Sequence, residues 1–391
     1  MPNYLEIQPD IIRWAIRRSG LPEEDLRNWK KGIVFLWENG EKKPTLSQLT
    51  DFAKKVHVPF GYLFLDTPPE EKIPVPDFRT FDDNRPRSFS PDLIDTLYDI
   101  QRRQNWMRDY LIEVGAEKLP FVGSLKKQHS VATAAEQIRQ NLGLAIDWMF
   151  RYPTPDQTRR FLRNSVDDAG IMISISGVVG WNNRRPLDPD EFCGFTLLDD
   201  YVPALFVNNN IPKSSQMFTI AHELAHIWMG KEGVFNQVDY HPDIRNRKDE
   251  ELCNKIAAEF LVPENLFRNK WMANRDDRTE FGDLAKTFKV SQIVVARRAF
   301  DLNLISNDEF YSFLHYIKQN FPETNDKKPT KKQGGNFYLN SRIKLGKRFS
   351  DAVISATRSG YLSYGDAFRL TGLNGATFDN YVSQLQGGKF D

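Results

Sequence analysis

Apolar residues recur at helical spacing along most of the chain. In the first 75 residues they mark short helices, one of which ends at Gly20. Another helix begins after Thr45, because Thr45 and Gln48 have the spacing of a capping box. The pattern predicts a bundle of short helices at the N-terminus.

The periodicity changes in the middle of the chain. Residues 91–168 have mainly helical spacing, whereas residues 170–208 contain three short segments rich in β-branched and aromatic residues, IMISIS, FCGFTLL and PALFVN. Helical spacing returns at about 214–229 and 249–261. The sequence therefore predicts a mostly helical α+β fold with a small antiparallel or mixed sheet.

Two later segments, 281–300 and 360–382, have the rhythm of a helix-turn-helix. In the first of them, Arg297 and Arg298 lie on the second predicted helix. DNA contact is one interpretation of both segments. A helical cap that packs against the core is the interpretation we favour.

Composition narrows the functional classes. The 53 Lys and Arg residues almost cancel the 52 Asp and Glu residues, so the whole chain has no field that draws it to nucleic acid or to an anionic membrane. The N-terminus lacks an apolar signal segment and no stretch reaches the length of a membrane span. With two cysteines a disulfide framework is excluded, and the sequence predicts a cytoplasmic protein.

The segment PKSSQMFTIAHELAHIWMG predicts the chemistry. We expect a helix that is capped by Ser214 or Ser215 and ends at Gly230. His222 and His226 lie four residues apart, so both imidazoles project from one face and can bind one zinc ion per chain. Glu223 follows the first histidine, where its carboxylate can face a metal-bound water as the general base.

A third ligand is expected from the next helix, KDEELCNKIAAEFLVP. Glu250 and Asn254 are spaced i, i+4, so the carboxylate can bind zinc while the amide supports a ligand histidine. Glu251 remains an alternative to Glu250, and Glu259 is a weaker candidate. A structural zinc site is less expected than a catalytic one, because only Cys253 is near among the cysteines that usually close such sites.

Substrate contacts are expected from two places. An extended substrate can pair with the main chain of the strand that precedes the zinc helix. Oxyanion donors can come from the loop between the two ligand helices. The expected strand consists of Ala204, Leu205, Phe206, Val207 and Asn208, and the expected oxyanion donors are Tyr240 and His241.

FTIAHELAHIW followed by EELCNKIAAEFLVP resembles the ImmA/IrrE (COG2856-type) metallo-endopeptidases, and ALFVNNN fits the strand that precedes their zinc helix. The N-terminal stretch that includes WENGEKKPTLSQLTDFAKKVHVPFGYLF resembles the Xre-type helix-turn-helix often fused to them. The resemblance implies a gluzincin-like minimal core in which His222, His226 and Glu250 bind zinc and Glu223 is the base. It also implies cleavage of a cognate repressor or antitoxin in a mobile-element or stress response.

The N-terminal segment departs from a DNA-reading domain. Its stretch GIVFLW is apolar where base-reading helices have polar residues, and residues 1–75 contain 11 basic and 11 acidic residues. DNA binding there is therefore weakly supported. A docking surface for a partner is one alternative, and another is that Phe35 and Leu36 simply fill the core of the domain.

Two functional alternatives to the peptidase remain. One is a DNA-binding regulator or antitoxin component with a structural or inactive metal site, and the other is a module that holds a toxin without cutting it. The predicted domains are a helix-turn-helix domain at 1–75, an extended connector at 76–90, the metallopeptidase domain at 91–270, a helical subdomain at 271–321, a linker at 322–335 and a basic helical extension at 336–391.

Overall fold

The computed structural model describes residues 4–71, 89–125, 129–231, 233–235, 248–273, 280–320 and 336–386. The chain divides into two compact units, and the division falls within helix α5 between Tyr98 and Asp99. Before this helix, the first unit contains α1 (Pro9–Ser19), α2 (Glu23–Asn28), η1 (Trp29–Gly32), α3 (Ile33–Glu38), α4 (Leu46–Lys55) and η2 (Phe60–Phe64).

The helices of the larger unit surround four short strands. In chain order the elements are α5 (Pro91–Glu113), α6 (Val131–Asn141), η3 (Trp148–Phe150), α7 (Pro155–Asp168), β1 (Met172–Ser176), β2 (Gly194–Leu197), β3 (Ala204–Asn208), α8 (Lys213–Met229), β4 (Gly233–Phe235), α9 (Lys248–Leu261), α10 (Glu264–Ala273), α11 (Glu280–Phe288), α12 (Gln292–Asp301), α13 (Asn307–Asn320), α14 (Phe337–Leu345), α15 (Lys347–Arg358), α16 (Tyr364–Thr371) and α17 (Gly375–Gln386). None of the helices in the described ranges is both long and apolar enough to cross a membrane.

Local signals in the first unit act as the sequence predicts. Gly20 ends α1 in the left-handed conformation, and Thr45 and Gln48 form the capping box of α4. Helix α3 is only six residues long, and it buries Val34 and Trp37. Leu36 is 39% exposed, so the interpretation that it fills the core is wrong.

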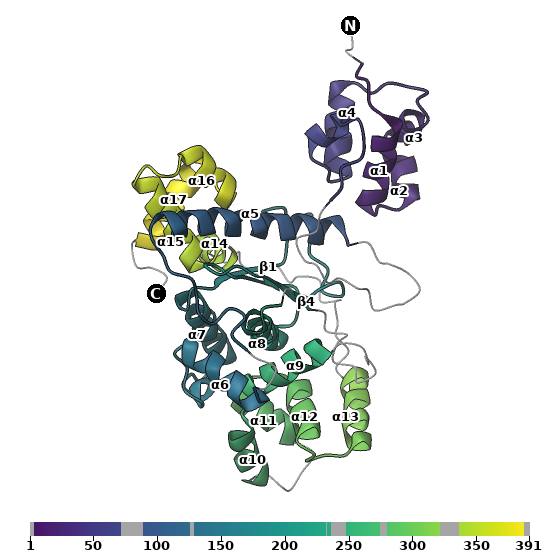
Figure 1. Cartoon of the computed structure of the whole chain (residues 1–391). Coiled ribbons are helices and arrows are strands. Elements are labelled where there is room, and N and C mark those ends of the chain that lie inside the picture. The colour runs from purple at the N-terminus through teal and green to yellow at the C-terminus, as the bar shows by residue number, and fades with distance from the viewer. Residues whose placement is uncertain are drawn as a thin grey trace. The chain divides into compact units, whose positions relative to one another are not determined.

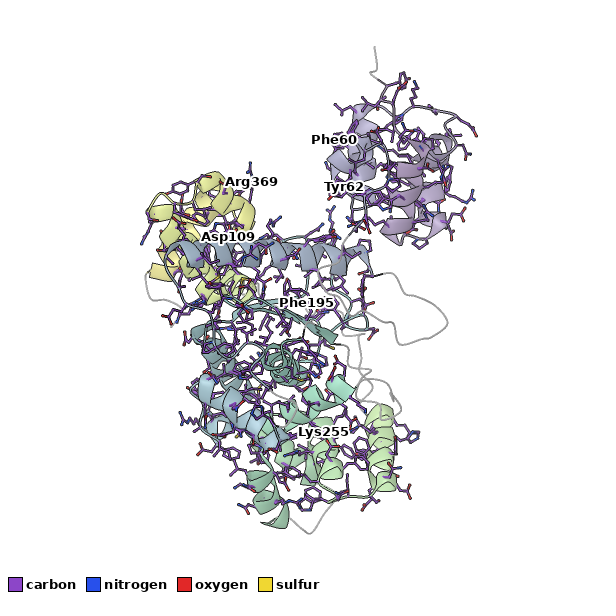
Figure 2. All side chains as sticks on the ribbon, in the orientation of Figure 1. Phe60, Tyr62, Asp109, Phe195, Lys255 and Arg369 are labelled. Carbon is purple, nitrogen blue, oxygen red and sulfur yellow. The ribbon has the colours of Figure 1, made fainter. Side chains whose placement is uncertain are left out.

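Exposed aromatic residues gather on η2 of this unit. Phe60, Tyr62 and Phe64 of η2 are each more than one third exposed, and the rings of Phe60 and Phe64 are in edge contact. Phe60 and Tyr62 are labelled in Figure 2.

The strands form one mixed sheet in the order β1-β3-β2-β4. Strand β3 pairs with β1 in parallel and with β2 in antiparallel fashion, and β2 pairs with β4 in antiparallel fashion. The predicted mostly helical α+β class and the three predicted strands are confirmed, and β4 is an additional strand that the sequence pattern did not predict.

Helices cover the sheet on both faces. Figure 1 shows the strands between α8 and the C-terminal part of α5. Gln104 of α5 donates from its buried amide to the carbonyls of Leu197 and Val202, at 2.9 and 3.1 Å. The main chain at the end of β2 is therefore fixed from the face opposite the zinc-motif helix.

The C-terminal helices close the outer edge of β1. The Ser174 hydroxyl donates to the carbonyl of Lys344 at the end of α14. Gly346 lies so close to β1 that an added Cβ would be 2.6 Å from the carbonyl oxygen of Ile173. This edge is thus covered by the chain itself.

Helices α11 and α12 pack on the core beneath α9. Arg298 of α12 forms a buried ion pair with Glu259 and donates to the carbonyl of Val262 at 3.0 Å. Arg297, its neighbour, pairs with Asp301 on the same helix. For residues 281–300 the predicted helical cap is therefore confirmed.

Candidate metal centre

Helix α8 is buried on all sides from Gln216 to Trp228 because it lies between the sheet and α9. It begins directly after Pro212 and ends at Gly230, whose φ of 66° is left-handed. The predicted stop is confirmed. The predicted caps are wrong, because Ser214 and Ser215 lie within the first turn of the helix. Pro212 occupies the N-cap position instead, and its ring fixes φ near the value found there.

The two histidines and Glu250 meet at one point. The Nε2 atoms of His222 and His226 are 3.0 Å apart. The Glu250 carboxylate oxygens lie 3.1 Å from the first Nε2 and 3.4 Å from the second. Helices α8 and α9 therefore bring together the three residues that the sequence proposes as ligands.

These distances fit a tetrahedral ion. Bonds of about 2.0–2.1 Å to a tetrahedral zinc place neighbouring ligand atoms about 3.3–3.4 Å apart. The three separations in the cluster, 3.0, 3.1 and 3.4 Å, are close to this value. His222 donates from Nδ1 to the Asn254 side-chain oxygen at 3.0 Å, which leaves the lone pair of Nε2 directed at the other two ligand atoms. Asn254 thus has the supporting position expected from its spacing.

The charges of the cluster also favour a cation. Burial lowers the pKa of the His222 imidazole. Burial alone would lower the pKa of the His226 imidazole, but interactions with Cys253, Glu250 and Glu223 raise it well above the usual value. Burial likewise opposes ionisation of Glu250, but its hydrogen bonds with the two histidines hold its pKa well below the usual value. An ionised carboxylate facing two imidazole nitrogens is a donor set suited to a divalent metal.

The other acidic candidates lie elsewhere. Glu251 is 60% exposed at its side chain and pairs with Lys255 of the same helix, at 2.6 Å. Glu259 pairs with Arg298. Lys255 is labelled in Figure 2. The geometry therefore favours Glu250 as the third ligand.

Glu223 is fully buried and faces strand β2. Its Oε2 accepts from the Thr196 hydroxyl at 2.7 Å, while Oε1 has no hydrogen-bond partner among the described residues. Burial raises the pKa of this carboxyl to about 8, against the hydrogen bond of Thr196 and the charge of His226. One oxygen is thus fixed, and the other is buried with its hydrogen-bonding capacity unused among the described residues.

Gly194 of β2 allows helix α8, which carries Glu223, to lie close to the strand. A Cβ at this position would lie 2.7 Å from Cγ2 of Thr219 on α8 and 2.8 Å from the Phe206 carbonyl oxygen. Sequence reasoning missed both Gly194 and Thr196. The signal was present, because a glycine within a strand often marks a close approach of another element.

The predicted substrate strand is wrong. The segment Ala204–Asn208 is strand β3, and it is paired along its whole length with β1 on one side and along residues 204–207 with β2 on the other. Its backbone groups are therefore already used, and it cannot add a substrate strand. Asn208 instead donates from its side chain to the carbonyls of Asp188 and Phe192. Tyr240 and His241, the predicted oxyanion donors, lie outside the described residues.

Two parts of the chain match known families. Residues 166–300, from the end of α7 to α12, match the IrrE N-terminal-like domain of the peptidase family M78. Residues 345–384 match a domain of unknown function, DUF8813. Neither match includes the N-terminal unit, and no curated protein matches the chain. The first match supports a metallopeptidase domain of the general ImmA/IrrE type.

Proposed function

We propose that the protein is a cytoplasmic zinc-dependent endopeptidase that cleaves one cognate regulatory protein, a repressor or an antitoxin. The observation that carries the proposal is the cluster of His222, His226 and Glu250. It lies beside Glu223, whose Oε1 has no hydrogen-bond partner among the described residues. The family match over residues 166–300 supports a metallopeptidase in general. The regulatory substrate follows from the resemblance to ImmA/IrrE proteins.

The residues divide the chemistry between them. His222, His226 and Glu250 would hold zinc, which when bound supplies a Lewis acid for the substrate carbonyl and lowers the pKa of a bound water. A divalent cation beside Glu223 would favour the ionised form of its carboxyl. Ionised, Glu223 takes the proton of the attacking water through Oε1 and passes it to the leaving amine. The Thr196 hydroxyl holds Oε2, so that the carboxylate does not rotate away.

The remaining sheet edge suits an extended substrate. Strand β4 pairs with β2 on one side, and no described strand pairs with its other side. β2 carries Thr196, which contacts Glu223. A peptide added to β4 would therefore run close to the base by main-chain pairing, the role that the sequence assigned to β3.

A structural metal site is the weaker interpretation. A closed zinc site needs a fourth protein ligand, usually a cysteine. Cys253 is buried next to the cluster, and its thiol interacts with His226 and contacts the sulfur of Met229 at 3.4 Å, but it is not a member of the group of possible ligands, His222, His226 and Glu250. Glu250 remains 16% exposed at its side chain, so the site reaches solvent on this side.

The test compares proteins from cells that produce the wild type, Glu223→Gln or the matched control Glu251→Gln. We expect one protein to be fragmented by the wild type and the control but not by Glu223→Gln. Metal analysis of the purified chains should give about one zinc per chain in all three, and His226→Ala should lose it. Fragmentation that persists in Glu223→Gln would contradict the mechanism, and wild-type protein without zinc would contradict the metal centre.

A further inference from the structure

The C-terminal helices have the architecture of a helix-turn-helix. Helix α15 is followed by the eight-residue α16, a three-residue turn of Gly372, Leu373 and Asn374, and the twelve-residue α17. Gly372 has a φ of 69° and its N–H bonds to the carbonyl of Phe368 at 2.8 Å. The match to a domain of unknown function covers these three helices, which indicates a module that recurs in other proteins.

One side of α17 holds the module together. Phe378 is buried against the rings of Tyr364 and Phe368, and the buried Tyr381 shares a hydrogen bond of 2.6 Å with Ser350 of α15. Ala367, Leu370 and Leu373 complete this small core. The helix is therefore fixed in orientation without using its other side.

The opposite side of α17 is exposed and has small side chains, three of them polar. Because they recur every three or four residues, they share one face of the helix. The exposed residues of this face are Ala376, Asp379, Asn380 and Ser383. Asn374 in the turn before the helix is exposed as well.

We propose that this face of α17 reads double-stranded DNA in the major groove, an activity beyond the proposed peptidase function and independent of it. The second helix of a helix-turn-helix lies in that groove with its N-terminal residues on base edges. Asparagine can bind adenine with two hydrogen bonds, alanine contacts the thymine methyl group, and serine can bond several bases. Asn380, Ala376 and Ser383 thus supply suitable groups within two turns of the helix start.

The C-terminal helices α14 to α17 are together more basic than the rest of the chain and so fit a polyanion better, although α15 to α17 alone contain four Lys and Arg against three Asp and Glu. Residues 336–386 contain six Lys and Arg against three Asp and Glu, while the whole chain has a net charge of only +1. Arg358 is exposed on α15, and Arg369 of α16 is 82% exposed at its side chain and is labelled in Figure 2. Both can contact phosphates. Asp379 is the acidic member of the face, and its carboxylate can accept only from the amino group of cytosine.

A protein partner is the rival occupant of this face. Partner-binding helices usually present apolar or aromatic anchors, and the exposed positions of α17 have none. The polar face and the nearby exposed Arg358 and Arg369 therefore favour DNA, and the test separates the two.

The experiment uses the full chain carrying Glu223→Gln and a pool of random-sequence duplexes. Repeated selection should enrich one short sequence, and fluorescence anisotropy should then compare its affinity for variants. Asn380→Ala should weaken binding roughly 5- to 150-fold, the range for loss of a bidentate base contact. Asn340→Ala, an exposed asparagine on α14, is the matched control and should change nothing. Arg369→Ala should reduce the slope of log affinity against log salt by about 1.

Three results would overturn the proposal. The first is a selection that enriches no sequence. The second is an enriched duplex that Asn380→Ala and Ala376→Glu both bind as tightly as the wild type does. The DNA would then bind at another part of the chain, such as the N-terminal unit. The third is an equal loss in Asn340→Ala and Asn380→Ala, which would show a general effect of substitution. Near-ultraviolet circular dichroism of each variant shows that the fold is retained.

Discussion

Helices α11 and α12 and helices α16 and α17 have the same sequence rhythm but different surroundings. In the first pair, Arg298 lies in the core and pairs with Glu259 of the ligand helix α9. All of the α12 side chains are buried or half-buried. In the second pair, α17 buries only the side that carries Phe378 and Tyr381. The first pair supports the metal centre, and the second leaves a helix face available to a partner.

The difference shows what periodicity can establish. Helical spacing identifies the residues that join two helices to each other. It does not identify what covers the outer face, because that depends on elements far away in the chain. Variants that weaken one pair and leave the other intact test this comparison directly.

The largest effect should come from Arg298→Ala. Removal of the guanidinium leaves Glu259 buried without its partner, so we expect a loss of about 3–5 kcal/mol in the free energy of unfolding. Arg369→Ala in α16 removes an exposed ion pair and should change stability by less than about 0.5 kcal/mol. Urea unfolding of the zinc-free chains measures both. Equal losses would show that the two helix pairs are held alike.

A pH-dependent effect should follow from Asp167, which joins α7 to the C-terminal module. Its carboxylate accepts from the backbone N–H groups of Lys347 and Arg348 at the start of α15, at 3.2 and 3.4 Å. Burial raises its pKa from 3.8 to about 7. Between these values the folded chain holds a proton that the unfolded chain has lost, so stability falls as the pH rises.

Asp167→Asn should remove this dependence. Relative to the variant, the wild type should lose on the order of 2–4 kcal/mol between pH 4 and pH 7.5, since each pKa unit corresponds to about 1.4 kcal/mol. Asp168→Asn is the control, because Asp168 is 64% exposed at its side chain and pairs with Lys347. Parallel stability curves for wild type and Asp167→Asn would contradict the assignment.

Local signals in the sequence predicted much of the site and little of its surroundings. The i, i+4 spacing of His222 and His226 places both imidazoles on one face of any helix, so their meeting depends only on α8. Glu250 required α9 to pack against α8, which the sequence suggested only through the spacing to Asn254. Thr196 and Gly194 were missed because they lie on β2 and come close to Glu223 only when the sheet packs against α8. No local pattern in the sequence relates them to Glu223.

The error in the substrate strand has the same origin. The apolar composition of PALFVN does not distinguish an edge strand from a central strand of a small sheet. Its position ahead of the zinc helix suggested that it had access to the site. Strand order is a long-range property, and β4 lies beyond the zinc helix in the chain. The pairing that placed β3 inside the sheet could not be obtained from the residues of β3 alone.

The smallest effect concerns the two turns. Lys289, after α11, has a φ of 60°, and Gly372, after α16, has a φ of 69°. This conformation costs a residue with a Cβ roughly 1–2 kcal/mol. Lys289→Gly should therefore stabilise the chain by up to about 1 kcal/mol, since greater freedom of the unfolded chain offsets part of the gain. Gly372→Ala should destabilise it by at least about 1–2 kcal/mol from the backbone conformation alone.

The two substitutions differ in their wider consequences. An added Cβ at Gly372 would lie 2.3 Å from Nε1 of Trp181, which donates to the Thr371 carbonyl at 2.9 Å. Gly372→Ala should thus disturb the attachment of the module as well as its turn, and weaken DNA binding with little change in zinc content. Lys289→Gly should leave both unchanged. If Gly372→Ala alters zinc content and leaves DNA binding intact, the roles that we assign to the two helix pairs are reversed.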